Sequence, residues 1–373
     1  MKFLALFLAL ASACGALADS VQVERRGDSW AITVSGSLPP QPVYRITAGG
    51  DLTVRGKTSR DIRYVITGRV RGGDEAAARR GAESFRVQNV SGQLFFPAPA
   101  AVRVELPRKS PYLSLWTPGG AIDAADLEGS VRADSAAGRI MLDRIGGDAE
   151  IHSEGGGATL GSIGGIVRCY SGGGAIRAVR VQGGATFQSG GGDIRLGEVM
   201  GPVRAVTAAG GIRIDHAGGT VYADTFGGPI SVLAALGLVI ARSAGGPIDI
   251  ADASSVQCQS ASGTIRLNNV SGALRASTRS GSIVAEILAG RALADSFLST
   301  GAGDITVFIP SDTGVTIRAE SGGPHNAESI ISDFSGLRIQ TTPAAATAQG
   351  KINGGGPVLR LIEAGGRIEI KRR

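Results

Sequence analysis

Cysteine, histidine and aromatic residues are scarce in this chain of 373 residues, which has three cysteines, three histidines and 5% aromatic residues. With so few cysteines, the fold does not rely on a framework of disulfides. His152 and His216, two of the three histidines, have no Cys or His partner at the spacing of metal ligands, so no metal site is predicted. The remaining histidine is His325.

Long hydrophobic runs are also rare, and the one long run lies at the N-terminus. It follows Lys2 and ends in an Ala-Leu-Ala motif at 16–18, directly before Asp19. This pattern is typical of a secretory signal peptide, here residues 1–18, with cleavage after the motif. Cys14 leaves open a lipoprotein alternative in which this residue is acylated. No later run is long enough for a transmembrane span, so we expect a mature protein in the periplasm, the cell envelope or the extracellular space.

Glycine, in contrast, is abundant, with 58 residues, and it recurs at a fixed period. From residue 120 to 303, successive glycines before an x-Ile pattern are 18 residues apart seven times, then 17, 18 and 22. The glycines are Gly120, Gly138, Gly156, Gly174, Gly192, Gly210, Gly228, Gly246, Gly263, Gly281 and Gly303. The aliphatic residues two positions later are Ile122, Ile140, Ala158, Ile176, Ile194, Ile212, Ile230, Ile248, Ile265, Ile283 and Ile305. Such a period predicts a stacked array whose units bury their apolar faces against one another.

Each repeat alternates apolar and polar residues in two short segments, as in the sequence GIVRCYSGGGAIRAVRV at 165–181. Alternation with period two indicates strands, and we expect the glycine clusters between them to supply the positive φ of tight corners. A βαβ sheet would need helices between strands, and a propeller blade would need roughly 40 residues. The predicted fold is therefore all-β, a single-chain parallel β-solenoid (β-helix) of about 18-residue rungs. The six-residue subperiod of the left-handed hexapeptide helix fails at Gly157, Ala175 and Asp193, and handedness stays open.

Three inward columns can be written from the period. The first is Val131, Ala149, Val167, Ala185, Val203, Val221, Val239, Val256 and Leu274. The second is Ala133, Ile151, Cys169, Phe187, Ala205, Ala223, Ala241, Cys258 and Ala276. The third is Ser135, Ser153, Ser171, Ser189, Thr207, Thr225, Ser243, Ser260 and Thr278, a hydroxyl ladder for corner backbone groups. A row of nucleophiles is the alternative, but no base accompanies each hydroxyl. Cys169 and Cys258 are five rungs apart, roughly 24 Å at one rung per strand spacing, beyond disulfide reach.

The period is lost towards both ends. Residues 19–117 are expected to form an N-terminal β-rich capping region with one helix near 75–86, since a solenoid must cover its ends. Repeats fill 118–310 as the β-solenoid proper. Residues 311–373 are expected to hold the C-terminal rungs and cap, with a small-residue loop at 344–349 and last strands in 354–361 and 366–370.

The order of the motifs carries a family resemblance. An exported β-rich lead-in is followed by S-x-x-G-x-I-x-L rungs, by ITVFIP at 305–310, by INGGGP at 352–357 and by a G-x-I-x-I strand at 366–370. This layout resembles the bacterial putative-adhesin family of unknown function that is related to the auto-transporter adhesin head GIN domain. The resemblance covers nearly the whole mature chain. It implies a β-helical cell-envelope protein and brings no catalytic residues.

Corner aspartates are the first candidates for chemistry. Asp193, Asp249 and Asp304 lie beside corners, where Asp commonly bonds to turn backbone. A calcium-binding solenoid would repeat G-G-x-G-x-D in every rung, and the pattern is approached only once, at 190–193. The glycine clusters open no helix and precede no Gly-Lys-Ser/Thr, so neither nucleotide nor any other cofactor is predicted.

The outward-facing arginines are less ordinary. Arg177, Arg195 and Arg213 follow the column isoleucine on consecutive rungs, and Arg132, Arg168 and Arg204 share a second row. Stacked guanidinium groups could bind carboxylates or phosphates of an acidic polysaccharide or another envelope component. The alternative is that arginine simply keeps the surface soluble. Nucleic acid is not expected as a partner, because the basic rows lack interleaved aromatic residues.

Together these observations predict a non-enzymatic, exported β-solenoid that acts as an adhesin-like or scaffold protein of the bacterial cell envelope. The alternative is a carbohydrate-active enzyme or a polysaccharide-binding β-helix. Such an enzyme would place paired carboxylates in an outward cleft between long loops. No such pair is evident, and the extra length within the array is confined to 289–299.

Overall fold

The computed structural model describes residues 17–322 and 329–373 and confirms a β-solenoid. Strands make up 61% of the chain and helix 3%, with turns about every 18 residues. The chain divides into two compact units, one ending at Gln182 and one comprising Gly183–Arg373. Most of the expected signal peptide, with Cys14, and His325 lie outside the described residues.

Two parallel sheets form the rungs of the first unit. In spatial order, the first sheet contains β7 (Gln93–Phe96), β3 (Arg45–Ala48), β9 (Tyr112–Thr117), β11 (Ser130–Ser135), β13 (Ala149–Ser153) and β15 (Val167–Ser171). The second contains β8 (Ala101–Pro107), β4 (Leu52–Lys57), β10 (Ile122–Leu127), β12 (Ile140–Ile145), β14 (Ala158–Ile163) and β16 (Ile176–Val181). One strand from each sheet makes a rung, so the sheets are joined at every corner.

The region expected as a cap contains two of these rungs. The β7–β8 rung is later in the chain than the β3–β4 rung, yet β3–β4 lies between it and β9–β10. Antiparallel strands then cover the end of the stack. They are β5 (Ile62–Arg71), β2 (Ser29–Leu38) and β1 (Leu17–Arg26) beyond β8, and β6 (Gln88–Val90) beyond β7.

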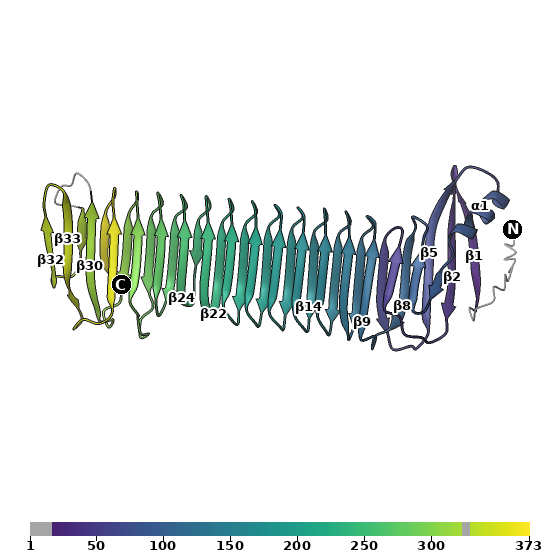
Figure 1. Cartoon of the computed structure of the whole chain (residues 1–373), viewed down its shortest axis with the longest axis horizontal. Coiled ribbons are helices and arrows are strands. Elements are labelled where there is room, and N and C mark those ends of the chain that lie inside the picture. The colour runs from purple at the N-terminus through teal and green to yellow at the C-terminus, as the bar shows by residue number, and fades with distance from the viewer. Residues whose placement is uncertain (1–16, 323–328) are drawn as a thin grey trace. The chain divides into compact units, whose positions relative to one another are not determined.

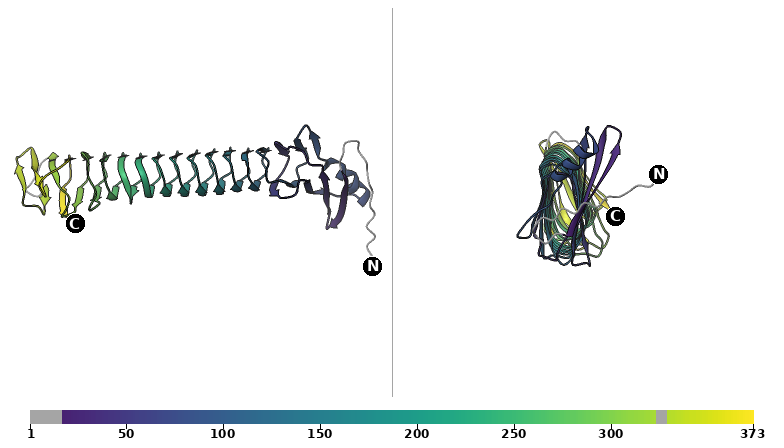
Figure 2. Two further views of the ribbon diagram at one scale, coloured as in Figure 1. Left: turned by 90° about the horizontal axis from the view of Figure 1, so that it is seen from below. Right: turned by 90° about the vertical axis from the view of Figure 1, so that its right-hand side faces the viewer.

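These purple strands lean away from the rungs of the same unit (Figure 2). The expected helix is present but short. It is α1 (Glu75–Gly81), followed by a 3-10 turn at Ala82–Ser84, and the Asp74 carboxylate caps it by accepting from the Ala77 N–H at 2.7 Å.

Two parallel sheets also form the second unit. The first contains β17 (Ala185–Ser189), β19 (Val203–Thr207), β21 (Val221–Thr225), the end of β22 (Ile230–Ser243), β24 (Ala253–Ser260), β26 (Leu274–Thr278), β28 (Ser296–Thr300), β34 (Val358–Glu363) and β30 (Val315–Gly322). The second contains β18 (Ile194–Val199), β20 (Ile212–Ala217), the start of β22, β23 (Ile248–Ile250), β25 (Ile265–Val270), β27 (Ile283–Ile287), β29 (Ile305–Ile309), β35 (Ile368–Arg372) and β31 (Ile330–Ser332). Figure 1 shows β22 and β24 as neighbouring strands of this array.

The C-terminal end repeats the out-of-order arrangement. The last rung of the chain, β34–β35, lies between β28–β29 and β30–β31 instead of at the edge. Antiparallel β33 (Ala345–Ile352) and β32 (Leu337–Thr341) extend the sheet beyond β30. The prediction of a loop at 344–349 is therefore wrong. Ala346 and Ala348 are buried against β30, and alternating small residues pack as a strand although they lack β-branched side chains.

The predicted core columns are confirmed. Every isoleucine of the x-Ile column is buried, as is Ala158. The Val and Ala/Cys columns are buried throughout, and so is the hydroxyl column apart from the partly buried Ser260. In the second unit, Ile194, Ile212, Ile230 and Ile248 are direct register partners along one sheet. Like residues therefore stack on like at about 4.8 Å.

The buried hydroxyls join each rung to the one before it. Thr225 donates its Oγ1 hydrogen to the carbonyl of Gly210 on the preceding rung at 2.9 Å and accepts the N–H of Gly228 in its own corner at 3.2 Å. Ser243 does the same with Gly228 and Gly246 at 3.1 and 2.9 Å. The predicted hydroxyl ladder is thus confirmed, and it satisfies buried backbone groups whose loss would be costly.

The expectation that the corner glycines supply a positive φ is wrong for most of them. Of the column glycines, only Gly303 has a positive φ. Most of the others share proximity to the previous rung. A Cβ on Gly228 would lie 2.1 Å from the carbonyl oxygen of Gly210, and one on Gly246 would lie 2.1 Å from that of Gly228. Glycine is required because the stacked corners leave no room for a side chain.

We expect Gly228→Ala to destabilise the second unit by about 1–3 kcal/mol, since the rungs must move apart to admit the methyl group. Gly227→Ala is the matched control, because its Cβ would meet no atom closer than 3.9 Å. The control should stay within about 0.5 kcal/mol of wild type. Urea denaturation of both variants measures the difference, and equal stabilities would contradict the steric explanation.

Candidate functional site

The predicted arginine stripe is solvent-exposed, but two of its members have local partners. Arg177 is exposed on β16, opposite Thr159. Arg195 and Arg213 are direct register partners on β18 and β20. Arg195 pairs with Asp193 at 2.7 Å, and Arg213 pairs with Asp215 at 3.0 Å. These carboxylates offset much of the positive charge that a polyanion would meet.

In the second arginine row, too, some arginines have local partners and others do not. In the first unit, Arg132 contacts Asp134 and Glu150, each at 2.9 Å, whereas Arg168 is exposed with no ion pair among the described residues. In the second unit, the guanidinium carbon of Arg204 lies 4.3 Å from the ring centroid of Tyr222. This row is therefore a mixed surface of charges and one aromatic ring.

An aromatic row on the first unit was missed by sequence reasoning. Adjacent outward positions on β7, β3, β9, β11, β13 and β15 are Phe95, Thr47, Trp116, Asp134, His152 and Tyr170. We call this set the aromatic row. Phe95, Trp116 and Tyr170 are 41%, 40% and 42% exposed. The rings of His152 and Tyr170 stack, with centroids 4.8 Å apart and an angle of 12°.

The signal for this row was present in the 18-residue spacing of Trp116, Asp134, His152 and Tyr170. It went unnoticed because Phe95 and Thr47 lie outside the period. The basic rows were expected to lack interleaved aromatic residues, and the structure adds that Tyr170, in the next row, projects from the same face of β15 as Arg168. The outward face of this sheet thus combines rings with guanidinium groups.

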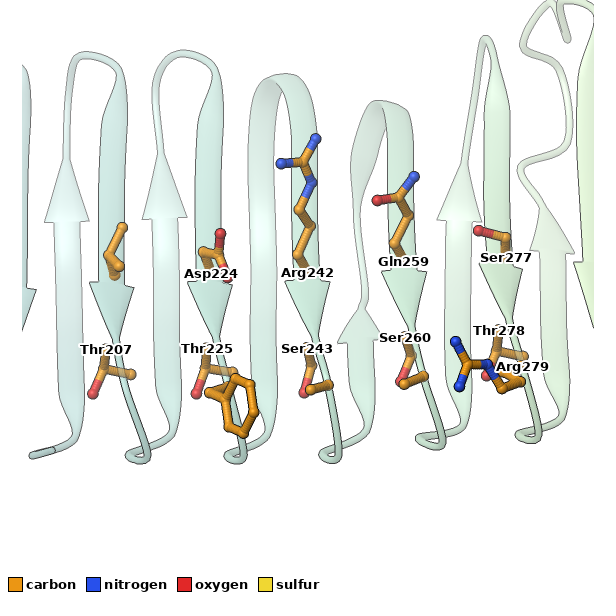
Figure 3. A pocket seen from close by; sticks show the side chains of 14 residues that line it. Thr207, Asp224, Thr225, Arg242, Ser243, Gln259, Ser260, Ser277, Thr278 and Arg279 are labelled. Carbon is orange, nitrogen blue, oxygen red and sulfur yellow. The ribbon is translucent and has the colours of Figure 1, made fainter.

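A hollow of about 620 Å³ lies in the second unit, over β19, β21, β22, β24 and β26. We call it the corner groove. It follows the hydroxyl column Thr207, Thr225, Ser243, Ser260 and Thr278, and one side is formed by the outward row Asp224, Arg242, Gln259 and Ser277 (Figure 3). Phe226 and Arg279 project from the corners next to it. The groove is shallow and open along the rungs.

A smaller hollow of about 330 Å³ lies in the first unit. Its carboxylates are bound by arginine, because Asp126 pairs with Arg144 at 2.7 Å and Glu128 lies 3.9 Å from Arg108. The hydrogen bond from Arg144, with its positive charge, lowers the pKa of Asp126. Both carboxylates are thus engaged in ion pairs.

The buried hydroxyls and thiols lack the features of nucleophiles. Hydroxyls such as those of Thr225 and Ser243 are bonded to corner backbone on two rungs. Cys169 and Cys258 are buried free thiols, and burial raises the pKa of each to about 12, so neither forms a thiolate near neutral pH. In the described ranges, no three or more His, Cys, Asp or Glu side chains gather as metal ligands.

The corner aspartates behave largely as expected. Asp193 accepts the N–H of Gly211 at 2.9 Å, and Asp304 accepts that of Arg367 at 2.9 Å. Asp249 differs, because its described contact is an ion pair with Arg266 at 3.7 Å. These aspartates therefore serve corners and surface charge.

Similarity to known proteins is slight. No family model and no curated protein matches the chain. A crystal structure of a putative cell adhesion protein from Clostridium sporogenes is similar, with 11% identity over 91% of this chain and 99% of that one, and a TM-score of 0.15. Within residues 17–322 and 329–373, none of the helical segments has the length and apolar character of a membrane span.

We expect the variant Asp193→Asn/Arg195→Gln/Arg213→Gln/Asp215→Asn, which removes both ion pairs without changing the net charge, to retain polyanion binding within about twofold of wild type, because the carboxylates already offset these arginines. Its stability should change by less than about 1 kcal/mol. Elution from a heparin column in a salt gradient measures the first quantity. A large fall in the eluting salt concentration would show that the stripe binds polyanions after all.

Proposed function

We propose that this chain is a non-enzymatic, exported β-solenoid that acts as an adhesin-like or scaffold protein of the bacterial cell envelope. The resemblance to the putative-adhesin family related to the GIN domain supports this proposal through the order of motifs. The stacked fold supplies long, regular faces for binding. Such surfaces suit recognition of extended partners.

The aromatic row is the observation that carries the proposal. Rings are few in this chain, yet three large ones and His152 line one outward row of the first unit. Exposed rings aligned on a rigid sheet are typical of binding surfaces, since they offer large contact areas at low cost in side-chain entropy. Arg168 and Arg132 beside the row add polar contacts around it.

The contents of the hollows favour binding over catalysis. Among the described residues that line the corner groove, Asp224 is the single carboxylate, and it accepts a hydrogen bond from the Tyr222 hydroxyl at 2.8 Å. Glycoside hydrolysis commonly uses two carboxylates on either side of the bond to be broken. The groove is therefore better suited to holding a ligand than to cleaving it.

Export predicts a defined mature N-terminus. We expect the protein recovered outside the cytoplasm to begin at Asp19 and to carry no lipid, because cleavage follows the Ala-Leu-Ala motif. Intact-mass and N-terminal peptide mass spectrometry of the exported form measure this. An acylated Cys14 at the N-terminus would support the lipoprotein alternative, and an uncleaved cytoplasmic chain would refute export.

For the binding surface, we expect Trp116→Ser/Tyr170→Ser to weaken attachment of protein-coated beads to bacterial cells roughly tenfold or more, because aromatic anchors dominate such interfaces. Phe297→Ser is the control, since this ring is 37% exposed, belongs to the second unit and is not a member of the aromatic row. Bead attachment under flow measures the effect, and circular dichroism checks folding.

Two outcomes contradict the proposal. If the double variant and the control attach as well as wild type, the aromatic row is not an adhesive surface. If the wild type binds single-stranded DNA more tightly than cells, and the double variant loses that binding, the row is a nucleic-acid site.

A further inference from the structure

Two protruding side chains, Phe226 and Arg279, enclose a stretch of the corner groove that we call the slot. Successive corner positions along it hold Phe226, Ala244, Ala261 and Arg279. Phe226 is 77% exposed, and Arg279 is also exposed. Three rung spacings separate them, or roughly 14 Å at about 4.8 Å per rung. The alanines between them form the floor of the slot, which has a ring at one end and a guanidinium at the other.

The groove lining has a net positive charge, because it contains Arg242 and Arg279 against Asp224. Among the described residues Arg279 has no ion pair, whereas Arg242 lies beside its register partner Asp224, the one acidic group in the lining, and its guanidinium carbon is 5.8 Å from the Tyr222 ring centroid. Figure 3 shows Arg279 turned toward the rung of Ser260, and Arg242 extended along its strand. The two arginines lie on rungs two apart, roughly 10 Å along the groove. A ligand with regularly spaced anionic groups complements this arrangement.

The corner backbone of the slot is already hydrogen-bonded. The N–H groups of Phe226, Ala244, Ala261 and Arg279 donate to carbonyls of preceding rungs at 3.2 to 3.3 Å. An added peptide strand would find few free main-chain partners here, which disfavours β-strand addition. A ligand in the slot must therefore be bound by side chains. The side chains present are one amide, one carboxylate, hydroxyls, guanidinium groups and a phenyl ring.

That set of groups fits an acidic sugar chain. Gln259, Ser277 and the free oxygen of Asp224 can bond to sugar hydroxyls, while the Phe226 ring offers a flat apolar surface for the face of a pyranose. Arg242 and Arg279 can bind carboxylates. A rung and an extended pyranose unit have similar lengths. Arginines whose backbones lie two rungs apart can therefore each reach, through their long side chains, a carboxylate on every second sugar.

We propose that the corner groove between Phe226 and Arg279 binds a linear acidic oligosaccharide with carboxylates on alternate sugars. This deepens the proposed function, because it gives a binding protein a ligand class and a second surface separate from the aromatic row. It assigns acidic-glycan binding to residues other than Arg177, Arg195 and Arg213.

The test uses the full mature chain and an unsulfated octasaccharide that alternates glucuronate with N-acetylhexosamine. Isothermal titration calorimetry in moderate salt should show binding by wild type, weakened about tenfold or more by Arg279→Gln and by Phe226→Ala. Arg266→Gln is the matched control, since it removes the same charge from the other sheet of this unit, where Arg266 faces Asp249. The control should bind within about twofold of wild type, because exposed pairs contribute little.

Two further probes separate the chemistry from plain charge. The same octasaccharide with its carboxylates reduced to alcohols should bind at least tenfold more weakly, and a polyglutamate of equal charge should show no dependence on Phe226. The inference is overturned if wild type does not bind the octasaccharide, if Arg266→Gln loses as much affinity as Arg279→Gln, or if polyglutamate binding depends equally on Phe226. Because these probes are purified soluble molecules, the result is independent of bead attachment through the aromatic row.

Discussion

The contact between one corner and the next is the constraint on which the rest of this protein depends. A Ser or Thr hydroxyl accepts the N–H of its own corner and donates to the glycine carbonyl of the preceding rung, as Thr225 does. The same approach brings Gly228 against the carbonyl of Gly210. Together they fix the rung spacing and the register of every column. The outward side chains inherit this regularity, so rings and charges from distant parts of the chain come to lie in rows.

Much of the fold could be predicted because the period is local information. A residue such as Ile194 has its neighbours 18 positions away on either side, and a repeat places them without any long-range search. The hydroxyl column followed from the same spacing. The role of glycine did not follow, since the sequence alone does not show whether a residue such as Gly228 is needed for a positive φ or for close packing against the next rung. The strand at Ala345–Ile352 was missed because alanines fit a loop and a strand equally well by composition.

The ends could not be predicted, because their order in space differs from their order in the chain. No spacing rule places β3 between β7 and β9, or β34 between β28 and β30. The candidate sites were only partly visible for a related reason. The arginine stripe was found by period alone, but its partners Asp193 and Asp215 were not. The slot becomes visible only when one corner column is read as Phe226, Ala244, Ala261 and Arg279, because large residues then stand out among small ones.

The displaced last rung also bears on how the molecule responds to tension. A strand at the end of a stack can be peeled away by breaking one ladder of hydrogen bonds at a time. β35 instead pairs with both β29 and β31, and β34 pairs with both β28 and β30. A force applied at Arg373 must therefore break two ladders on each strand before the array can unravel. The last rung is held on both sides by its neighbours in the two sheets. A protein pulled from that end would therefore resist extension better than a solenoid whose rungs follow the order of the chain.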